Sequence, residues 1–351
     1  MAKLGFDLRT CRGCLSTAAS AKGWAICLGA GASDPIFPRW GGLVKKLLEW
    51  SNKLLTPNEI SDLLKSLSLE SLIQSVFHRK SMGSARFADL LTGLLYSDLK
   101  AKVSAKEWRL IEQLFADVSV PSMTPARAAG FLTLIANRYP NSTPLQLAEV
   151  LGRSIRSNRG PSAVLSFNAE PLLLILARAY IWTNTQLPKR RYFDPSLRGM
   201  SHRNINRIPY HFCHGLLPLP GRRAKWRTAS LDKLVFSETD YLNVASSSFS
   251  WQSAVFLNAA MTHSLVFVGM SFTDQNLRRW LGFVHANRME ELRRTGHRVH
   301  ASTQHYWINK RPSTNRQQKV IEASTAHLGV RLVWIDDWSE TRTALERMLI
   351  L

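Results

Sequence analysis

The chain has 351 residues, which suffice for one large domain or two modest ones around a sizeable buried core. With 45% hydrophobic and 20% charged residues, its composition is that of a globular protein, and its longest apolar stretch is too short to cross a bilayer. The 46 Lys and Arg outnumber the 25 Asp and Glu, giving a formal charge of +21. Such a charge is typical of proteins that meet nucleic acid, an anionic cofactor or an acidic protein, and also of a merely solvated basic surface.

The N-terminal residues carry one C-x-x-C pattern, formed by Cys11 and Cys14. The other two cysteines, Cys27 and Cys213, form no second pair of this kind, so the four thiols lack the spacing of a zinc tetrahedron. We therefore expect no zinc and no other metal site. The chain shows no signal peptide and no disulfide-like cysteine spacing, so we expect it in the reducing cytoplasm.

The stretch Trp24–Leu28 is a short apolar run with the length of a buried strand, and it ends at Gly29-Ala30-Gly31. A strand, a glycine-rich turn and the start of a helix together place backbone N–H groups where a pyrophosphate can bind. Asp34 stands where the third glycine of Gly-x-Gly-x-x-Gly would be. The stretch alone therefore leaves two interpretations open, a phosphate-binding turn and a plain structural turn.

Short apolar runs separated by helical patterns continue along the chain and predict a parallel sheet. After the first strand, the predicted strands are 163–167, 210–213, 234–237, 265–269, 305–309 and 330–335. Residues from about 41 to 157 show Leu-rich helical periodicity with little strand signal. We expect an α/β fold, a Rossmann-like parallel sheet flanked by helices, with this stretch as a helical insertion after the first strand. The expected organisation is an N-terminal arm (1–22) followed by one domain (23–351).

Polar residues follow three of the later predicted strands, at the strand ends where α/β sheets place their ligands. Asn168 follows the second predicted strand, and His214 follows the third. The strand that ends at Gly269 is followed by Ser271 and Asp274. Asn168 and His214 each also have a purely structural interpretation. Asparagine often caps a helix, and a histidine at a strand end is often a core residue.

A polar, basic region rich in Pro and Gly extends from about residue 186 to 227. Aromatic residues interleave with its basic side chains, as they do in grooves that bind nucleic acid, although a solvated loop can have the same composition. The basic residues are Lys189, Arg190, Arg191, Arg222, Arg223, Lys225 and Arg227, with Tyr192 and Trp226 among them. Nucleic acid is therefore a candidate partner.

Four short motifs, taken in chain order, resemble those of the sirtuin-like (silent information regulator) superfamily. They are Gly-Ala-Gly-Ala-Ser (29–33), Asn168 after a strand, His-Gly (214–215) and Gly-x-Ser-x-x-Asp (269–274). The similarity is strongest to the NAD-cleaving domains of bacterial antiphage defence systems, in which a Pro and a Trp follow the first motif as Pro38 and Trp40 do here. The segment 234–241 and the closing HLGVRLVWIDD also resemble these domains, so the resemblance spans about residues 23–337.

The resemblance implies that NAD binds at the strand ends. Gly29 and Gly31 would let the backbone approach its pyrophosphate. Asn168 would hold the nicotinamide ribose or the attacking water, and His214 would act as a general base or ribose partner. The implied NAD-binding residues are Gly29, Ala30, Gly31, Ala32, Ser33, Trp40, Glu170, Gly269, Ser271 and Asp274. Among them, Glu170 stands where the defence domains usually carry Asp.

The activity implied by the resemblance is that of an NAD+ glycohydrolase, which would act in abortive infection by depleting NAD+. Protein-deacylating sirtuins carry a four-cysteine zinc module that this chain lacks, which disfavours acyl-lysine as a substrate. The alternative is a non-catalytic module that binds NAD or ADP-ribose and docks nucleic acid or an acidic protein. By the same resemblance we expect a homo-oligomer or a complex with a partner such as a HerA-type hexameric ATPase, contacted through the helical insertion.

Overall fold

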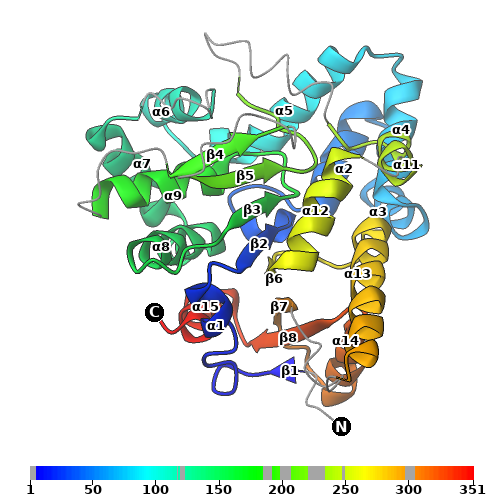
Figure 1. The fold of residues 1–351 in the computed structure, drawn as a ribbon. Coiled ribbons are helices and arrows are strands. Elements are labelled where there is room, and N and C mark those ends of the chain that lie inside the picture. Colours follow the sequence, from blue (N-terminus) through cyan, green and yellow to red (C-terminus); the bar gives the residue numbers. More distant parts are fainter. Residues whose placement is uncertain are drawn as a thin grey trace.

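The computed structural model describes residues 5–116, 118, 123–184, 192–197, 207–219, 234–246, 250–296 and 305–351. At its centre lies one sheet of eight strands in the order β1-β8-β7-β6-β2-β3-β5-β4, and every neighbouring pair is parallel (Figure 1). The strands are β1 (Gly5–Phe6), β2 (Trp24–Leu28), β3 (Ala163–Ser166), β4 (Phe193–Ser196), β5 (Ile208–Phe212), β6 (Ser264–Val268), β7 (His305–Lys310) and β8 (Val330–Ile335). Helices flank the sheet, so the predicted Rossmann-like α/β fold is confirmed.

The helices before β3 are α1 (Ser16–Ser20), η1 (Ala30–Ser33), α2 (Trp40–Ser51), α3 (Pro57–Ser66), α4 (Leu69–Arg79), α5 (Ser84–Ala101), α6 (Ala105–Phe115), α7 (Pro125–Arg138) and α8 (Thr143–Arg156). The later helices are α9 (Leu172–Asn184), α11 (Glu238–Ser246), α12 (Trp251–Thr262), α13 (Gln275–Arg294), α14 (Asn315–Ala326), η3 (Trp338–Glu340) and α15 (Thr341–Leu349). None of these described helices combines the length and the apolar character that a membrane span requires.

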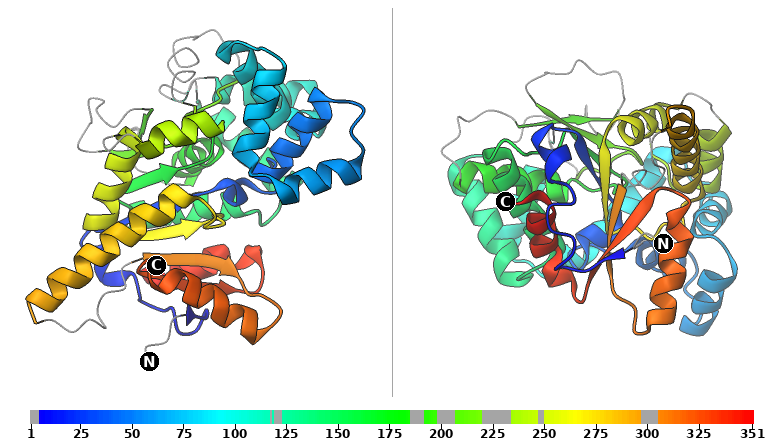
Figure 2. Two further views of the ribbon diagram at one scale, coloured as in Figure 1. Left: turned by 90° about the vertical axis from the view of Figure 1, so that its right-hand side faces the viewer. Right: turned by 60° about the horizontal axis from the view of Figure 1, so that its bottom comes forward.

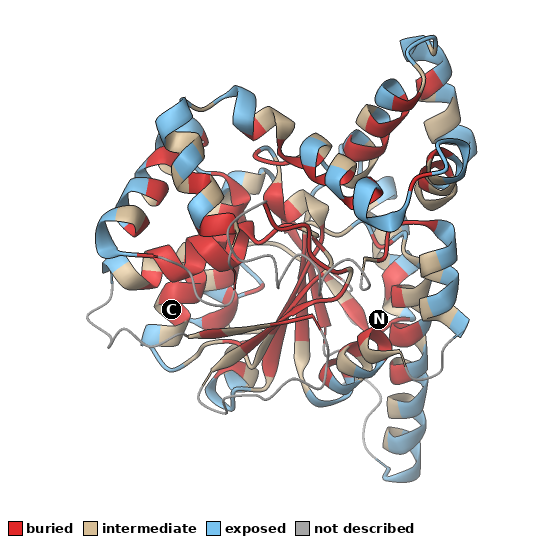
Figure 3. Cartoon of the chain, turned by 90° about the horizontal axis from the view of Figure 1, so that it is seen from above, coloured by how far each residue is buried: buried red, intermediate tan, exposed pale blue. Residues whose placement is uncertain are grey.

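The central strands β2, β3 and β6 are mostly apolar because both faces of the sheet are covered. Successive residues of β2 point to opposite faces and all are buried. Ile26 and Leu28 join the core cluster that includes residues of α8, α9 and α15, whereas Ala25 and Cys27 join the cluster that includes residues of α12 and α13. Figure 3 shows the buried strands between layers of helices whose outer surfaces are exposed.

The described residues between β2 and β3 form helices α2 to α8 and no strand. Local sequence sets where these helices begin: Thr56 with Glu59 forms a capping box at α3, and Ser104 with Glu107 forms another at α6. In Figure 1, α2, α3 and α4 lie at the right of the sheet and α6, α7 and α8 at the left. Helix α8 packs against α9 and α15, so the last helix of this stretch belongs to the layer that covers the sheet.

Strand prediction from the sequence is wrong at 234–237. These residues form no strand, because the Asp240 carboxylate accepts hydrogen bonds from the backbone N–H groups of Phe236 (3.3 Å) and Ser237 (2.9 Å) and turns the chain into α11. Conversely, the apolar pattern does not predict β1 or β4. Strand β1 has two residues, and β4 reads Phe-Asp-Pro-Ser, whose proline is tolerated because β4 lies at the edge of the sheet.

The N-terminal residues from Gly5 onward lie against the opposite edge of the sheet and the last helix (Figure 2). Strand β1 pairs with β8, and the N–H groups of Gly13 and Leu15 donate to the carbonyls of Arg347 and Met348 in α15. This part of the expected arm therefore adds an edge strand to the sheet.

The turn after β2 packs tightly on the turn after β6, at the point where β3 lies on one side of β2 and β6 on the other. Gly29 N–H donates to the Val268 carbonyl at 3.0 Å, and Gly31 N–H donates to the Gly269 carbonyl at 2.9 Å. A Cβ on Gly29 or Gly31 would lie 2.6 or 2.9 Å from that Gly269 oxygen, and a Cβ on Gly269 would overlap the backbone nitrogen of Ala32. The close contact between the two turns is therefore a sufficient reason for glycine at positions 29, 31 and 269.

We expect Gly269→Ala to lower the free energy of unfolding by at least about 2 kcal/mol. Its φ of +68° costs an L-residue about 1–2 kcal/mol, and the added Cβ overlaps Ala32. Urea unfolding followed by circular dichroism measures the change. The matched control is Gly93→Ala in the exposed interior of α5, where no atom lies within 4 Å of the added Cβ and a gain of up to about 1 kcal/mol is expected. A wild-type urea midpoint for Gly269→Ala would contradict the tight contact.

Candidate active site

Side chains from four strand ends gather at the carboxyl edge of the sheet. The turn after β2 carries Ser33, and the turn after β3 carries Asn168 and Glu170. His214 follows β5, and Asp274 follows β6 at the start of α13. These residues form two polar clusters, one around Glu170 and one around His214.

The Glu170 cluster consists of Ser33, Asn168 and Glu170, all nearly fully buried. Asn168 Nδ2 donates to Ser33 Oγ at 3.1 Å and to Glu170 Oε1 at 3.2 Å. The Ser33 hydroxyl also donates to Glu170 Oε1, and the backbone N–H of Leu172 donates to Glu170 Oε2 at 2.5 Å. The cluster thus links the turn after β2 to the turn after β3.

Burial raises the pKa of Glu170 to about 7, although the hydrogen bonds from Ser33, from Leu172 N–H and from Asn168 oppose this shift. Its charge also contributes to the raised pKa of Tyr96 and of Tyr210, for which burial is the larger cause. The carboxyl group of Glu170 therefore changes its protonation near neutral pH.

Asn168 does not cap the helix that follows it. Its Nδ2 group is used within the Glu170 cluster, and the first N–H of α9, that of Leu172, is bonded by Glu170 instead. Asn168 Oδ1 is buried and accepts no hydrogen bond from the described residues. A buried acceptor without a donor is costly and is commonly completed by a ligand or a water molecule. Asn168 Oδ1 is therefore an acceptor that the described residues leave without a donor.

The His214 cluster consists of His214, Tyr241 and Asp274. The Tyr241 hydroxyl lies 3.4 Å from His214 Nδ1, and Asp274 Oδ2 lies 4.0 Å from His214 Nε2. Burial lowers the pKa of His214, while the Asp274 carboxylate acts to raise it. Asp274 Oδ1 also accepts the N–H groups of Asn276 (2.8 Å) and Leu277 (3.2 Å) and so begins α13. The imidazole is therefore neutral at neutral pH and held between two polar groups.

Aromatic side chains lie at or near this edge of the sheet. The Phe167 ring, one residue before Asn168, packs edge-on against His214 with centroids 5.0 Å apart. Trp40, predicted from its place after the first motif, packs against Phe236 with ring centroids 4.9 Å apart and planes tilted by 55°. Its indole Nε1 is buried and donates to no described residue. Among the described residues, Trp40 Nε1 is thus a buried donor without an acceptor, as Asn168 Oδ1 is a buried acceptor without a donor.

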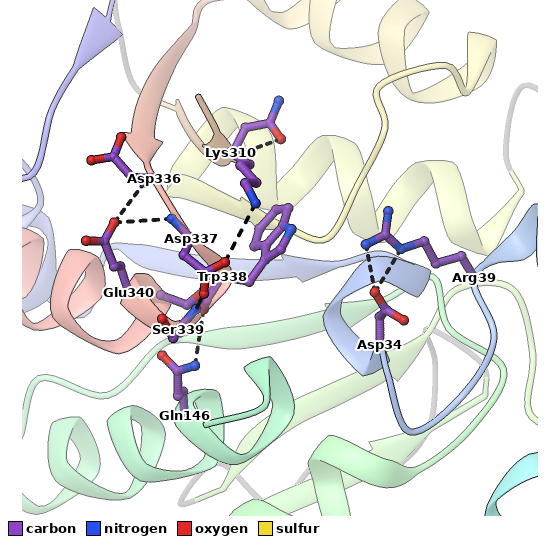
Figure 4. Close-up of polar contacts among 11 residues, drawn as sticks. Asp34, Arg39, Gln146, Lys310, Asp336, Asp337, Trp338, Ser339 and Glu340 are labelled. Atoms are coloured by element: carbon purple, nitrogen blue, oxygen red, sulfur yellow. Dashed lines mark hydrogen bonds and ion pairs between the residues drawn. The ribbon is translucent and has the colours of Figure 1, made fainter. Parts of the chain in front are cut away.

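The remaining predicted residues differ in how closely they approach the clusters. Ala30 is half-buried in the turn after β2, whereas Ser271 is exposed and its hydroxyl bonds that of Thr273 at 2.7 Å. Asp34, at the position of the missing third glycine, pairs with Arg39 at 2.7 Å (Figure 4). The roles in NAD binding that were predicted for the turn residues stay predictions.

Sequence reasoning missed a polar group at the ends of β7 and β8 (Figure 4). Lys310 Nζ lies 3.6 Å from Asp337 Oδ2, and Gln146 of α8 donates to the Trp338 carbonyl at 3.1 Å. The only sequence signal was the closing motif HLGVRLVWIDD, which assigned no role to single residues. These side chains extend the carboxyl edge of the sheet beyond β6.

The described residues contain no group of three or more His, Cys, Asp or Glu side chains that could hold a metal ion, and all four cysteines are free thiols. The basic residues predicted to form a nucleic-acid groove, at 189–191 and 222–227, lie outside the described residues.

We expect the contribution of Glu170 to the free energy of unfolding to fall as the pH rises from about 4.5 to about 7. It is measured as the difference between the wild type and Glu170→Gln, because burial lowers the pKa of His305 to about 3 and this changes the stability in the opposite sense. Folding raises the pKa of Glu170 from 4.5 to about 7, so between these values the folded protein keeps a proton that the unfolded chain has released. This contribution is full below pH 4.5, is lost as the pH approaches 7, and is on the order of 3 kcal/mol. Urea unfolding at several pH values should show it in the wild type and in the exposed control Glu49→Gln. The same pH dependence in Glu170→Gln would contradict the assignment.

Residues 174–332 match the family model of the SIR2-like domain. The matched range runs from α9 into β8 and includes His214, Gly269 and Asp274, whereas Ser33 and Asn168 precede it. No curated protein matches the chain. From the match and the parallel α/β sheet, we conclude that the chain carries a sirtuin-like domain.

Proposed function

We propose that the chain is an NAD+ glycohydrolase, which cleaves the bond between nicotinamide and ribose and releases nicotinamide and ADP-ribose. The observation that carries this proposal is the buried Asn168 Oδ1, an acceptor that no described residue satisfies, at the carboxyl end of β3. The SIR2-like domain supports NAD as the bound molecule.

Cleavage of this bond demands positioning more than a strong nucleophile. The C1′–N bond breaks with its electron pair going to the nicotinamide, which leaves as a neutral molecule, and the ribose develops oxocarbenium-like positive charge. Water then adds to C1′ and loses one proton. A site for this reaction has to hold the ribose and the water, stabilise the developing charge and accept that proton.

The two clusters suit these tasks. Asn168 Oδ1 would accept a hydrogen bond from a ribose hydroxyl or from the attacking water, in a setting where a hydrogen bond is strong because water is excluded. His214, whose lowered pKa keeps it neutral, would take the proton once its Nδ1 is released from Tyr241. Asn168 would thus act in the orientation that the structure holds, whereas His214 would act after its contact with Tyr241 has opened.

The ADP half of NAD would extend from the Glu170 cluster along the carboxyl edge. Dinucleotides lie across this edge at the switch point of doubly wound sheets, which here is the contact between the turns after β2 and β6. Beyond that contact, Trp338 offers an aromatic surface and Lys310 a positive charge. This orientation places nicotinamide towards β3 and β5, and adenosine towards β7 and β8.

The physiological part of the proposal is an effector of antiphage defence that depletes cellular NAD+ in infected cells. It is supported by the resemblance of the four motifs to bacterial defence domains. Such an activity has to be restrained, so we include in the proposal a homo-oligomer or a partner, such as a HerA-type hexameric ATPase, that releases it.

A second candidate function is a module that binds NAD or ADP-ribose without cleaving it. The arrangement of His214 favours this candidate, because both ring nitrogens face protein groups, Tyr241 and Asp274, and neither is directed to a free position. The two candidates differ in whether NAD+ is consumed.

The test incubates purified protein with NAD+ and follows nicotinamide and ADP-ribose by chromatography. We expect cleavage, and we expect Asn168→Ala and His214→Ala to lower kcat on the order of a hundredfold or more while the protein stays folded. Asn258→Ala and His327→Ala, which change the same residue types at exposed positions, serve as matched controls and should keep wild-type kcat. NAD+ that stays intact but binds measurably would contradict the hydrolase and favour the binding module.

A further inference from the structure

We infer that Glu170 is a positioning residue, which fixes the end of the Asn168 amide that faces the reacting ribose. The inference rests on the proposed function, because the reaction is the one proposed above. It differs from the sequence-based expectation, in which Glu170 was grouped with the residues that contact NAD.

The hydrogen bonds around Glu170 all run in one direction. The Ser33 hydroxyl, Asn168 Nδ2 and the backbone N–H of Leu172 all donate to its two carboxylate oxygens. Ser33 Oγ in turn accepts the second contact of Asn168 Nδ2. Both oxygens of Glu170 are therefore engaged as acceptors, and Oε1, as an acceptor, selects the NH2 end of the neighbouring amide.

Because an amide is planar, fixing its NH2 end also fixes its oxygen. With Nδ2 held by Ser33 and Glu170, Asn168 Oδ1 points away from both, which is the orientation in which it finds no described donor. The flipped amide would place Oδ1 against Glu170 Oε1, where two acceptors repel, and would offer NH2 to the ribose. Glu170 therefore decides whether the site presents an acceptor or a donor.

The surroundings of Glu170 strengthen its preference for the NH2 end of the Asn168 amide. The carboxyl group is buried, and the titratable groups whose pKa its charge raises are two neutral phenols, Tyr96 on α5 and Tyr210 on β5. No basic side chain among the described residues contributes to its protonation balance. The three donors are thus the main stabilisation of its charge, and each is costly to lose in a water-excluded site.

Glu170→Gln tests whether Glu170 sets the orientation of the Asn168 amide, because glutamine has almost the same size and shape as glutamate. Glutamine has one side-chain oxygen, and if Leu172 N–H keeps it, the new NH2 group faces the NH2 of Asn168. The Asn168 amide then turns over and presents a donor to the ribose. We expect kcat to fall on the order of a hundredfold with a much smaller change in KM. Asn168→Asp, which sets two carboxylates against each other, should also lose turnover.

The double variant Asn168→Asp with Glu170→Gln restores the match. The NH2 group introduced at position 170 can donate to one oxygen of the carboxylate introduced at position 168, which leaves the other oxygen as an acceptor for the ribose. We expect kcat to recover at least tenfold over either single variant, and the melting temperature to recover with it, so that the effects are strongly non-additive. Glu49→Gln, the same change at an exposed position, should leave both quantities unchanged.

Two outcomes would overturn the inference. One is a Glu170→Gln variant with wild-type kcat, and the other is a double variant whose losses in melting temperature simply add. If the wild type cleaves no NAD+ at all, the proposed function fails. The melting temperatures still decide the matter in that case: recovery in the double variant supports the orienting role of Glu170, and simple addition contradicts it.

Discussion

The contact between the turn after β2 and the turn after β6 is the constraint on which the site depends. Gly29 and Gly31 bond to backbone carbonyls at the end of β6, and Gly269 adopts a left-handed conformation that leaves room for Ala32. A turn held in this way cannot shift relative to the sheet, so Ser33 stands at a fixed place. Ser33 in turn bonds to Asn168 and Glu170 in the turn after β3. The contact between the first two turns therefore also positions the Glu170 cluster.

The site contains two titratable groups whose charged forms are both disfavoured by burial. The low-dielectric surroundings raise the pKa of the Glu170 carboxyl to about 7 and lower the pKa of His214. Perturbed pKa values of this kind are typical of groups that share acid, base and positioning work at one site. Here the buried carboxyl orients an amide, and the neutral imidazole is the group able to accept a proton.

Much of the fold could be predicted from the sequence because a parallel sheet buried on both faces leaves continuous apolar runs, such as those of β2 and β6. Edge strands leave no such signal: β1 is too short, and β4 contains a proline. The segment 234–237 has strand-like composition, but the bonds from its backbone to Asp240 decide its shape, and these bonds are invisible to periodicity.

The candidate site could be predicted as a set of strand ends but not as two clusters. Spacing along the chain places Asn168 and His214 after strands, yet it does not show that Glu170 bonds Asn168 or that Tyr241 meets His214. It also suggested a phosphate contact for Gly29 and Gly31, whereas the structure gives these glycines a separate reason in the contact with β6. Contacts between residues more than 100 positions apart, such as Ser33 with Glu170, depend on the order of strands in the sheet.

The most direct test of the account is a crystal structure of the protein with carba-NAD, an analogue whose ribose ring oxygen is replaced by a methylene so that it resists cleavage. The account predicts a hydroxyl of the nicotinamide ribose, or a water molecule beneath its C1′, within about 3.2 Å of Asn168 Oδ1. It also predicts that Asn168 Nδ2 stays bonded to Ser33 and Glu170. An analogue bound with its nicotinamide ribose out of reach of Asn168 would contradict the account.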